Sequence, residues 1–114
     1  MYVDRNVYLN GAYQYKDEEH FLELDYNPNL NSQEKDGSVY LSMKFDERID
    51  EFKNVIVTTD LLGKAVLPNQ SYEHPDGSPL TIDKDFFGKK RRDSNPTAGP
   101  FENPDTGKIR LKVW

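Results

Sequence analysis

Residues 57–102 constrain the fold more than any other part of the chain. This stretch holds five of the seven prolines and four of the seven glycines, set among aromatic and acidic residues. Proline fixes φ, and glycine permits the positive φ of tight turns. The stretch therefore predicts a long, rigidly specified loop system carried on short strands, and loops of this kind commonly carry function.

Two runs of alternating apolar and polar residues predict the clearest strands. The first is residues 39–45, whose apolar face holds Val39, Leu41, Met43 and Phe45 and whose other face holds Tyr40, Ser42 and Lys44. The second is residues 108–114, with Ile109, Leu111 and Val113 inward and Arg110, Lys112 and Trp114 outward. A period of two is the mark of a half-buried strand.

Shorter patterns predict the remaining elements. Residues 7–9 and 12–15 form a hairpin around Asn10-Gly11, and residues 21–26 form a strand. Residues 55–59 are β-branched and apolar on both faces, which predicts a central strand. Residues 64–67 and 80–82 are short strands around Pro75-Asp76-Gly77. Residues 46–54 form a helical turn capped by Asp46, with Ile49 and Phe52 inward, or a loop.

About seven strands and at most one helical turn predict an all-β fold. A length of 114 residues suits one domain, spanning residues 1–114. The spacing of the turns favours a single β-sandwich of jelly-roll or immunoglobulin-like type with long Pro/Gly-rich loops. An open barrel is the alternative.

Charge and composition reduce the number of partner classes that the chain can be expected to bind. The formal net charge of -5 disfavours nucleic acid and anionic membranes, and leaves neutral sugars, cations and proteins open. The chain has no cysteine, and it has no apolar run of the length that spans a membrane. No signal peptide is visible at the amino terminus, so localisation, in a bacterial cytoplasm or outside the cell, stays open.

Acidic residues in the loop region are the candidates for catalysis or for Ca²⁺ binding. Asp83 and Asp85 lie close in sequence, with Asp60, Glu73 and Asp76 in the same region. A pair of carboxyl groups can cleave a glycosidic bond, and Ca²⁺ prefers clustered oxygens. Adjacent acids are also usual on a solvated loop, which is the favoured reading. His20 and His74 lack metal-ligand spacing, so no metal site is predicted, although Ca²⁺ remains open.

Aromatic residues are the candidates for stacking on a sugar ring. Phe86, Phe87 and Phe101 more simply hold loops onto the core, because large apolar groups are usually buried. Tyr40 and Trp114 lie on the outward face of their strands and are better candidates for exposed contacts. The basic run at residues 89–92 is expected to be a solvated loop or a docking surface.

Several phrases resemble segments of bacterial glycoside hydrolases. They are LLGKAVLP, YEHPDGSPLTIDKDFFGKKR, NPTAGPFE and the closing LKVW, and the most specific part spans residues 85–91 and 96–102. In particular they resemble the β-xylosidase-like enzymes of family 120, in which a β-sandwich lies beside a right-handed β-helix that bears the catalytic acids. This chain is too short, and has no repeat, to hold such a helix together with a sandwich.

The resemblance implies a non-catalytic accessory β-sandwich of a larger glycoside hydrolase, with a catalytic β-helix domain as partner and an oligosaccharide as a further partner. Its rivals are a free-standing carbohydrate-binding module, a structural or protein-interaction domain, and an independent hydrolase. No catalytic residue is assigned to this chain. The expected contacts with a sugar or a neighbouring domain are Tyr72, Asp83, Asp85, Phe86, Arg91 and Trp114.

Overall fold

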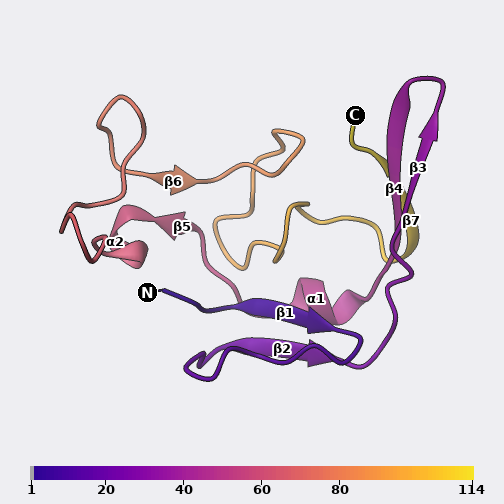
Figure 1. Ribbon diagram of the computed structural model, residues 1–114, viewed down its shortest axis with the longest axis horizontal. Coiled ribbons are helices and arrows are strands. Elements are labelled where there is room, and N and C mark those ends of the chain that lie inside the picture. The colour runs from indigo at the N-terminus through magenta and orange to yellow at the C-terminus, as the bar shows by residue number, and fades with distance from the viewer. Residues whose placement is uncertain (1) are drawn as a thin grey trace.

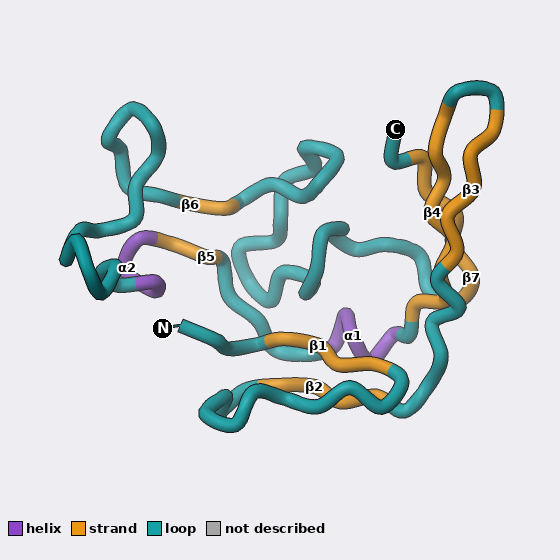
Figure 2. Tube along the Cα trace, in the orientation of Figure 1, coloured by secondary structure: helices purple, strands orange, loops and turns teal. Residues whose placement is uncertain are grey.

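The computed structural model describes residues 2–114, which form seven short strands and two short helices joined by long loops (Figures 1 and 2). The strands are β1 (Asn6–Leu9), β2 (Phe21–Leu24), β3 (Asn31–Lys35), β4 (Ser38–Phe45), β5 (Val57–Thr58), β6 (Thr81–Ile82) and β7 (Gly107–Lys112). The helices are α1 (Glu47–Glu51) and α2 (Thr59–Leu62). Among the described residues, neither helix has the length and apolarity to cross a bilayer. The all-β class is confirmed, and the sheets form a small sandwich-like domain.

The largest sheet is three-stranded and antiparallel, in the order β3-β4-β7. The strand predicted at residues 39–45 is confirmed, that predicted at residues 108–114 is confirmed as far as residue 112, and Met43 lies opposite Ile109. No strand was predicted at β3, because its residues are all polar and show no alternation with apolar ones. Asp36 and Gly37 both have positive φ, which suits the two-residue hairpin turn that returns β3 beside β4. Pairing therefore makes a strand of a segment whose residues are all exposed.

A second sheet consists of β1 and β2, which run parallel with Asn6 opposite Phe21. The chain turns at Asn10-Gly11 as predicted, but residues 12–15 form no returning strand, so the predicted hairpin is wrong. In place of a returning strand, the buried carboxylate of Glu18 binds β1. Glu18 Oε1 accepts the Asn6 amide at 3.0 Å, and Oε2 accepts the Tyr8 hydroxyl at 2.6 Å.

The third sheet pairs β5 with β6. The short strand predicted at residues 80–82 is present as β6, whereas residues 64–67 contribute only a bridge between Lys64 and Ser71. The strand predicted at residues 55–59 shortens to the two residues of β5, and the prediction that it is central was wrong, because β5 pairs with β6 alone in a two-stranded sheet. It ends there because Thr58 caps α2, with its hydroxyl accepting the Leu61 amide at 3.2 Å.

The core is small and lies where α1, β2, β4 and β7 meet. Asp46 caps α1 as predicted, accepting the Arg48 amide. Ile49 of α1 is 3% exposed and packs with three other buried residues, namely Leu24, Phe45 and Ile109. Phe52, expected to face inward, is half-buried at the end of the helix.

The molecule is extended for its size. Its radius of gyration is 16.1 Å, against about 13 Å for a compact domain of this length. Its accessible surface is 8229 Å², against about 6,450 Å² for a compact monomer of 13.3 kDa. The β3–β4 hairpin and the loops around α2 and β6 project at opposite ends (Figure 1). The fold therefore leaves much surface uncovered.

We expect Ile49→Ala to lower the free energy of unfolding by about 2–5 kcal/mol, because a cavity replaces a buried side chain in a core with few other members. Urea denaturation followed by circular dichroism measures this. Leu67→Ala is the control, since Leu67 is 97% exposed. Equal losses in the two variants would show that Ile49 does not anchor the core.

Candidate functional site

The loop formed by residues 83–102 is organised around the carboxylate of Glu102, which is 2% exposed. Its Oε2 accepts the Thr97 amide at 3.0 Å, and its Oε1 accepts Arg92 Nε at 2.9 Å. Arg91 Nη1 lies 3.5 Å from Oε2. Both oxygens are thus neutralised by hydrogen-bond donors, which a buried carboxylate requires.

Asp85 closes the first turn of this loop. Its Oδ1 accepts the amides of Phe87 at 2.9 Å and Lys89 at 2.8 Å, and its Oδ2 accepts the Glu102 amide at 3.0 Å. These hydrogen bonds, that from the Glu102 amide foremost, lower the pKa of Asp85 below its ordinary value. An ionised Asp85 therefore holds the two ends of the loop together.

Arg91 holds the same loop together by donating hydrogen bonds to its backbone, a set of contacts here called the Arg91 clamp. Its guanidinium donates to the carbonyl oxygens of Lys84 at 3.3 Å, Thr97 at 2.9 Å and Gly99 at 2.8 Å. The planar guanidinium group suits several acceptors at fixed positions. The residues that carry the resemblance to glycoside hydrolases therefore hydrogen-bond to one another and to the backbone around them.

Three phenylalanines form a cluster beside this clamp. Phe87 stacks on Phe101 with ring centroids 5.5 Å apart, and Phe86 meets Phe101 edge-on at 6.2 Å. Phe101 is buried, as predicted, and lines one groove with the core residues Phe45 and Ile49. Phe86 is 60% exposed and Phe87 is also exposed, so the same prediction was wrong for them. They extend the cluster outward because the Asp85 turn carries them away from the core.

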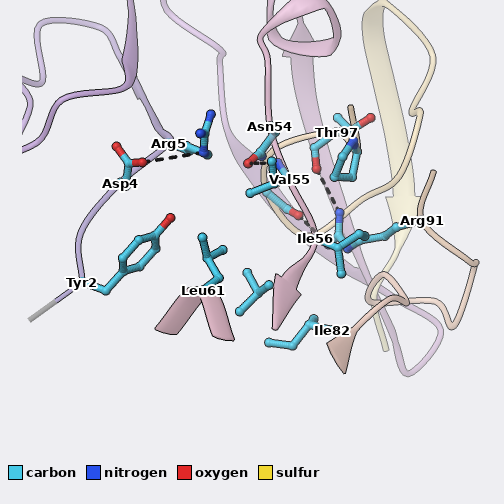
Figure 3. A pocket seen from close by; sticks show the side chains of 13 residues that line it. Tyr2, Asp4, Arg5, Asn54, Val55, Ile56, Leu61, Ile82, Arg91 and Thr97 are labelled. Atoms are coloured by element: carbon cyan, nitrogen blue, oxygen red, sulfur yellow. Dashed lines mark hydrogen bonds and ion pairs between the residues drawn. The ribbon is translucent and has the colours of Figure 1, made fainter. Parts of the chain in front are cut away.

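A pocket of about 180 Å³ lies between the amino-terminal segment, β5 and the loop (Figure 3). Tyr2, Asp4 and Arg5 lie on one side, with Arg91 and Thr97 on the other. Arg5 Nη1 donates to the Lys53 carbonyl at 3.3 Å. Its buried Nε forms an ion pair with Asp4 Oδ2 at 3.6 Å, which is too long for a hydrogen bond (Figure 3). The wall combines polar groups with apolar Ile56, Leu61 and Ile82.

The six predicted contact residues do not form one site. Asp83, Asp85, Phe86 and Arg91 lie together in the loop, and the Asp83 carbonyl accepts the Arg91 amide at 2.7 Å. Tyr72 lies in the loop between α2 and β6. Trp114 follows β7 at the opposite end of the molecule and is 84% exposed (Figure 1). Sugar or domain contact at these positions stays a prediction.

Of the acidic residues considered for catalysis, Asp85 has a carboxylate that accepts three backbone amides. Glu102, a further acid of the loop region, likewise has both carboxylate oxygens bound by donors. Within residues 2–114, no three His, Asp or Glu side chains are grouped so as to hold a metal ion.

Sequence reasoning missed one surface. On the face of the β3-β4-β7 sheet that points away from the core, strand register brings together five cationic residues, here called the basic face: Lys35, Lys44, Lys108, Arg110 and Lys112. The alternation in two strands indicated parts of this face, but the pairing of β7 with β4 could not be read from the alternation.

We expect the order of the loop to depend on pH through Asp85. Because its folded pKa is lowered, its contribution is present above the unfolded value of about 3.9 and is lost as the pH falls through the folded pKa. Amide NMR signals of Phe87, Lys89 and Glu102 should move together in acid. Asp85→Asn should abolish this transition, whereas Asp83→Asn should keep it. A transition that persists in Asp85→Asn would contradict the assignment.

We expect Arg91→Lys to lower the free energy of unfolding by about 1–3 kcal/mol, because an ammonium cannot reach three carbonyl oxygens at once. Arg110→Lys, on an exposed strand face, should change stability by less than about 0.5 kcal/mol. Urea denaturation of both variants makes the comparison. Equal stability of Arg91→Lys and the unaltered protein would show that the clamp contributes nothing.

Comparison with known proteins found one informative similarity. No family model matches the chain, and no curated protein matches it. A solved structure, the complex of XylC with xylose, superimposes with a TM-score of 0.88 at 30% sequence identity. The match covers 99% of this chain and 18% of the XylC chain. The chain is thus similar, over nearly its whole length, to a segment that makes up less than a fifth of XylC.

Proposed function

We propose that the chain is a non-catalytic accessory β-domain of a larger carbohydrate-active protein of the glycoside hydrolase type. The observation that carries the proposal is the match to XylC, which covers this chain almost completely but only 18% of the larger one. The structure of XylC is that of a complex with xylose, so the matched segment belongs to a protein that holds a sugar.

The extended shape supports a packing role. The chain exposes about 1,800 Å² more than a compact monomer of its mass. Stable interfaces typically bury about 800 Å² on each partner, so this excess is enough for a substantial contact. In this proposal the partner is a catalytic β-helix domain, which supplies the acidic residues for sugar cleavage.

An apolar groove is the proposed contact surface. It has a volume of about 400 Å³ and is open beside β1, β4 and the loop at residues 98–101. Its apolar lining includes Val7, Leu9, Leu30, Leu41 and Met43. Phe101 extends the groove toward exposed Phe86. Of the apolar lining side chains, Leu30 is 64% exposed and the other four are half-buried. Apolar area left open in this way is typical of surfaces that another body covers.

The predicted contact residues take two roles in this proposal. Phe86, Tyr72 and Trp114 are exposed aromatics that contact the larger body or its sugar. Asp83, Asp85 and Arg91 position the loop through the hydrogen bonds described above. No residue of the chain is given a catalytic role.

A free-standing carbohydrate-binding module is the second candidate. The exposure of Tyr72 and Trp114 favours it. These side chains lie at opposite ends of the molecule, however, and a stacking platform needs its aromatics side by side.

A chimera tests the proposal. We expect XylC in which this chain replaces the matched segment to be soluble and to bind xylose in calorimetry, because the two segments share a fold and, in this proposal, a packing surface. Leu30→Glu in the chimera should abolish soluble expression or xylose binding, since it places a charge in the groove. Leu67→Glu is the matched control and should have no effect.

A chimera that binds xylose equally well with Leu30→Glu would show that the groove is not the packing surface. A chimera that does not fold, although this chain alone is folded, would overturn the accessory role. Circular dichroism of the 114-residue chain and of its Leu30→Glu variant separates loss of packing from loss of folding.

A further inference from the structure

The outer face of the β3-β4-β7 sheet concentrates positive charge in an acidic protein. Its rows pair Gln33 with Tyr40 and Lys112, then Asn31 with Ser42 and Arg110, then Lys44 with Lys108. Lys35 extends the face beside Ser38. Five of the 15 lysines and arginines thus share one face with no acidic residue in these rows, although the net charge is -5.

The cations of the basic face are exposed and form no ion pair within residues 2–114. Ion pairs elsewhere in residues 2–114 use Arg5, Arg48, Arg91, Arg92 and His20, and none uses a member of the basic face. The Arg110 guanidinium instead lies over the Tyr40 ring, 4.1 Å from its centroid. Like charges on adjacent strands repel one another, so the folded chain bears a cost that an anion would relieve.

Asp46, the acid that follows β4, is already engaged by another residue. Hydrogen bonds from Arg48 lower the pKa of Asp46 to about 2, and the charge of Lys44 contributes least. Arg48 Nη2 lies 2.8 Å from Asp46 Oδ2. The Asp46 carboxylate therefore does not neutralise the basic face. Asp105, which lines a neighbouring pocket with Lys108 and Arg110, forms no ion pair with either among the described residues.

Neutral polar groups complete the surface. A groove of about 630 Å³ runs over it, lined by Asn29, Asn31, Gln33, Ser42, Lys108 and Arg110 among others. Amide and hydroxyl groups can both donate and accept, as sugar hydroxyls do. Exposed Trp114 is held at the end of the sheet, where the Val39 amide donates to its carbonyl at 2.8 Å.

We propose that the basic face binds an acidic oligosaccharide whose uronic-acid carboxylates pair with these cations. The inference rests on the proposed function for its choice of a sugar ligand. The carboxylates pair with Arg110, Lys108 and Lys44, and the amides of Asn31 and Gln33 bind hydroxyls. Spread over three strands, the cations contact several sugar units at once.

A short oligosaccharide fits the charge distribution better than nucleic acid does. A nucleic-acid duplex is long enough to be repelled by the rest of this protein, whose net charge is negative. Nucleic-acid binding depends on a positive electrostatic potential that extends over many phosphates. A ligand confined to the sheet face interacts electrostatically mainly with these cations, because salt screens its interactions with charges farther than about 8–10 Å away. An acidic protein surface is the rival that the experiment must separate.

The test is an NMR titration of the 114-residue chain with tetragalacturonate, its fully methyl-esterified form and a poly-glutamate peptide. We expect tetragalacturonate to shift the amides of Lys44, Lys108 and Arg110, with affinity falling about tenfold when salt is raised well above physiological strength. The neutral ester should bind at least tenfold more weakly. Equal binding of acid and ester, or tighter binding of poly-glutamate, would overturn the proposal.

Matched variants locate the site. Lys108→Gln with Arg110→Gln should weaken tetragalacturonate binding at least tenfold, whereas Lys84→Gln with Lys90→Gln removes the same charge from another surface and should leave binding within twofold. Equal losses would show a nonspecific charge effect and contradict the proposal. Introduced into the XylC chimera, the first pair should leave xylose binding intact. Failed oligosaccharide binding with an intact chimera would therefore overturn this inference alone.

Discussion

The buried carboxylate of Glu102 is the interaction on which the loop half of the molecule depends. It joins Thr97 to both Arg91 and Arg92, and Arg92 continues to Asp50 of α1 at 2.6 Å. A buried carboxylate without donors costs several kcal/mol, so the loop and the helix must hold their positions for Glu102 to stay inside. A polar network thus specifies a region that has few apolar residues to pack.

The small core and this hydrogen-bond network stabilise different parts of the molecule. Leu24, Phe45, Ile49 and Ile109 close only the centre, and the loop region keeps its shape through hydrogen bonds instead. Such a structure can hold a defined form while leaving its apolar groove and the Phe86–Phe87 edge open to solvent. That combination is what the proposed accessory role requires of a chain that matches less than a fifth of XylC.

Sequence patterns correctly predicted the elements that depend on interactions between neighbouring residues. Alternation placed β4 and β7, and Asp46 capped α1 as its side-chain chemistry requires. Predictions failed where tertiary contacts decided. Glu18 bound β1, which paired in parallel with β2, Thr58 capped α2 and ended β5, and polar β3 became a strand through its turn and its partner.

The sequence by itself determined the all-β class, the two main strands and which residues make up the loop at 83–102. Turn preferences and the alternation of apolar and polar residues both depend on a few neighbouring residues. The sequence placed Asp85 and Arg91 among the candidates, but not their contacts with Glu102 and with loop carbonyls. Only the tertiary structure decided these contacts and the basic face, because Arg110 meets Ser42 through strand register. Register joins residues far apart in the chain, and no local preference encodes it.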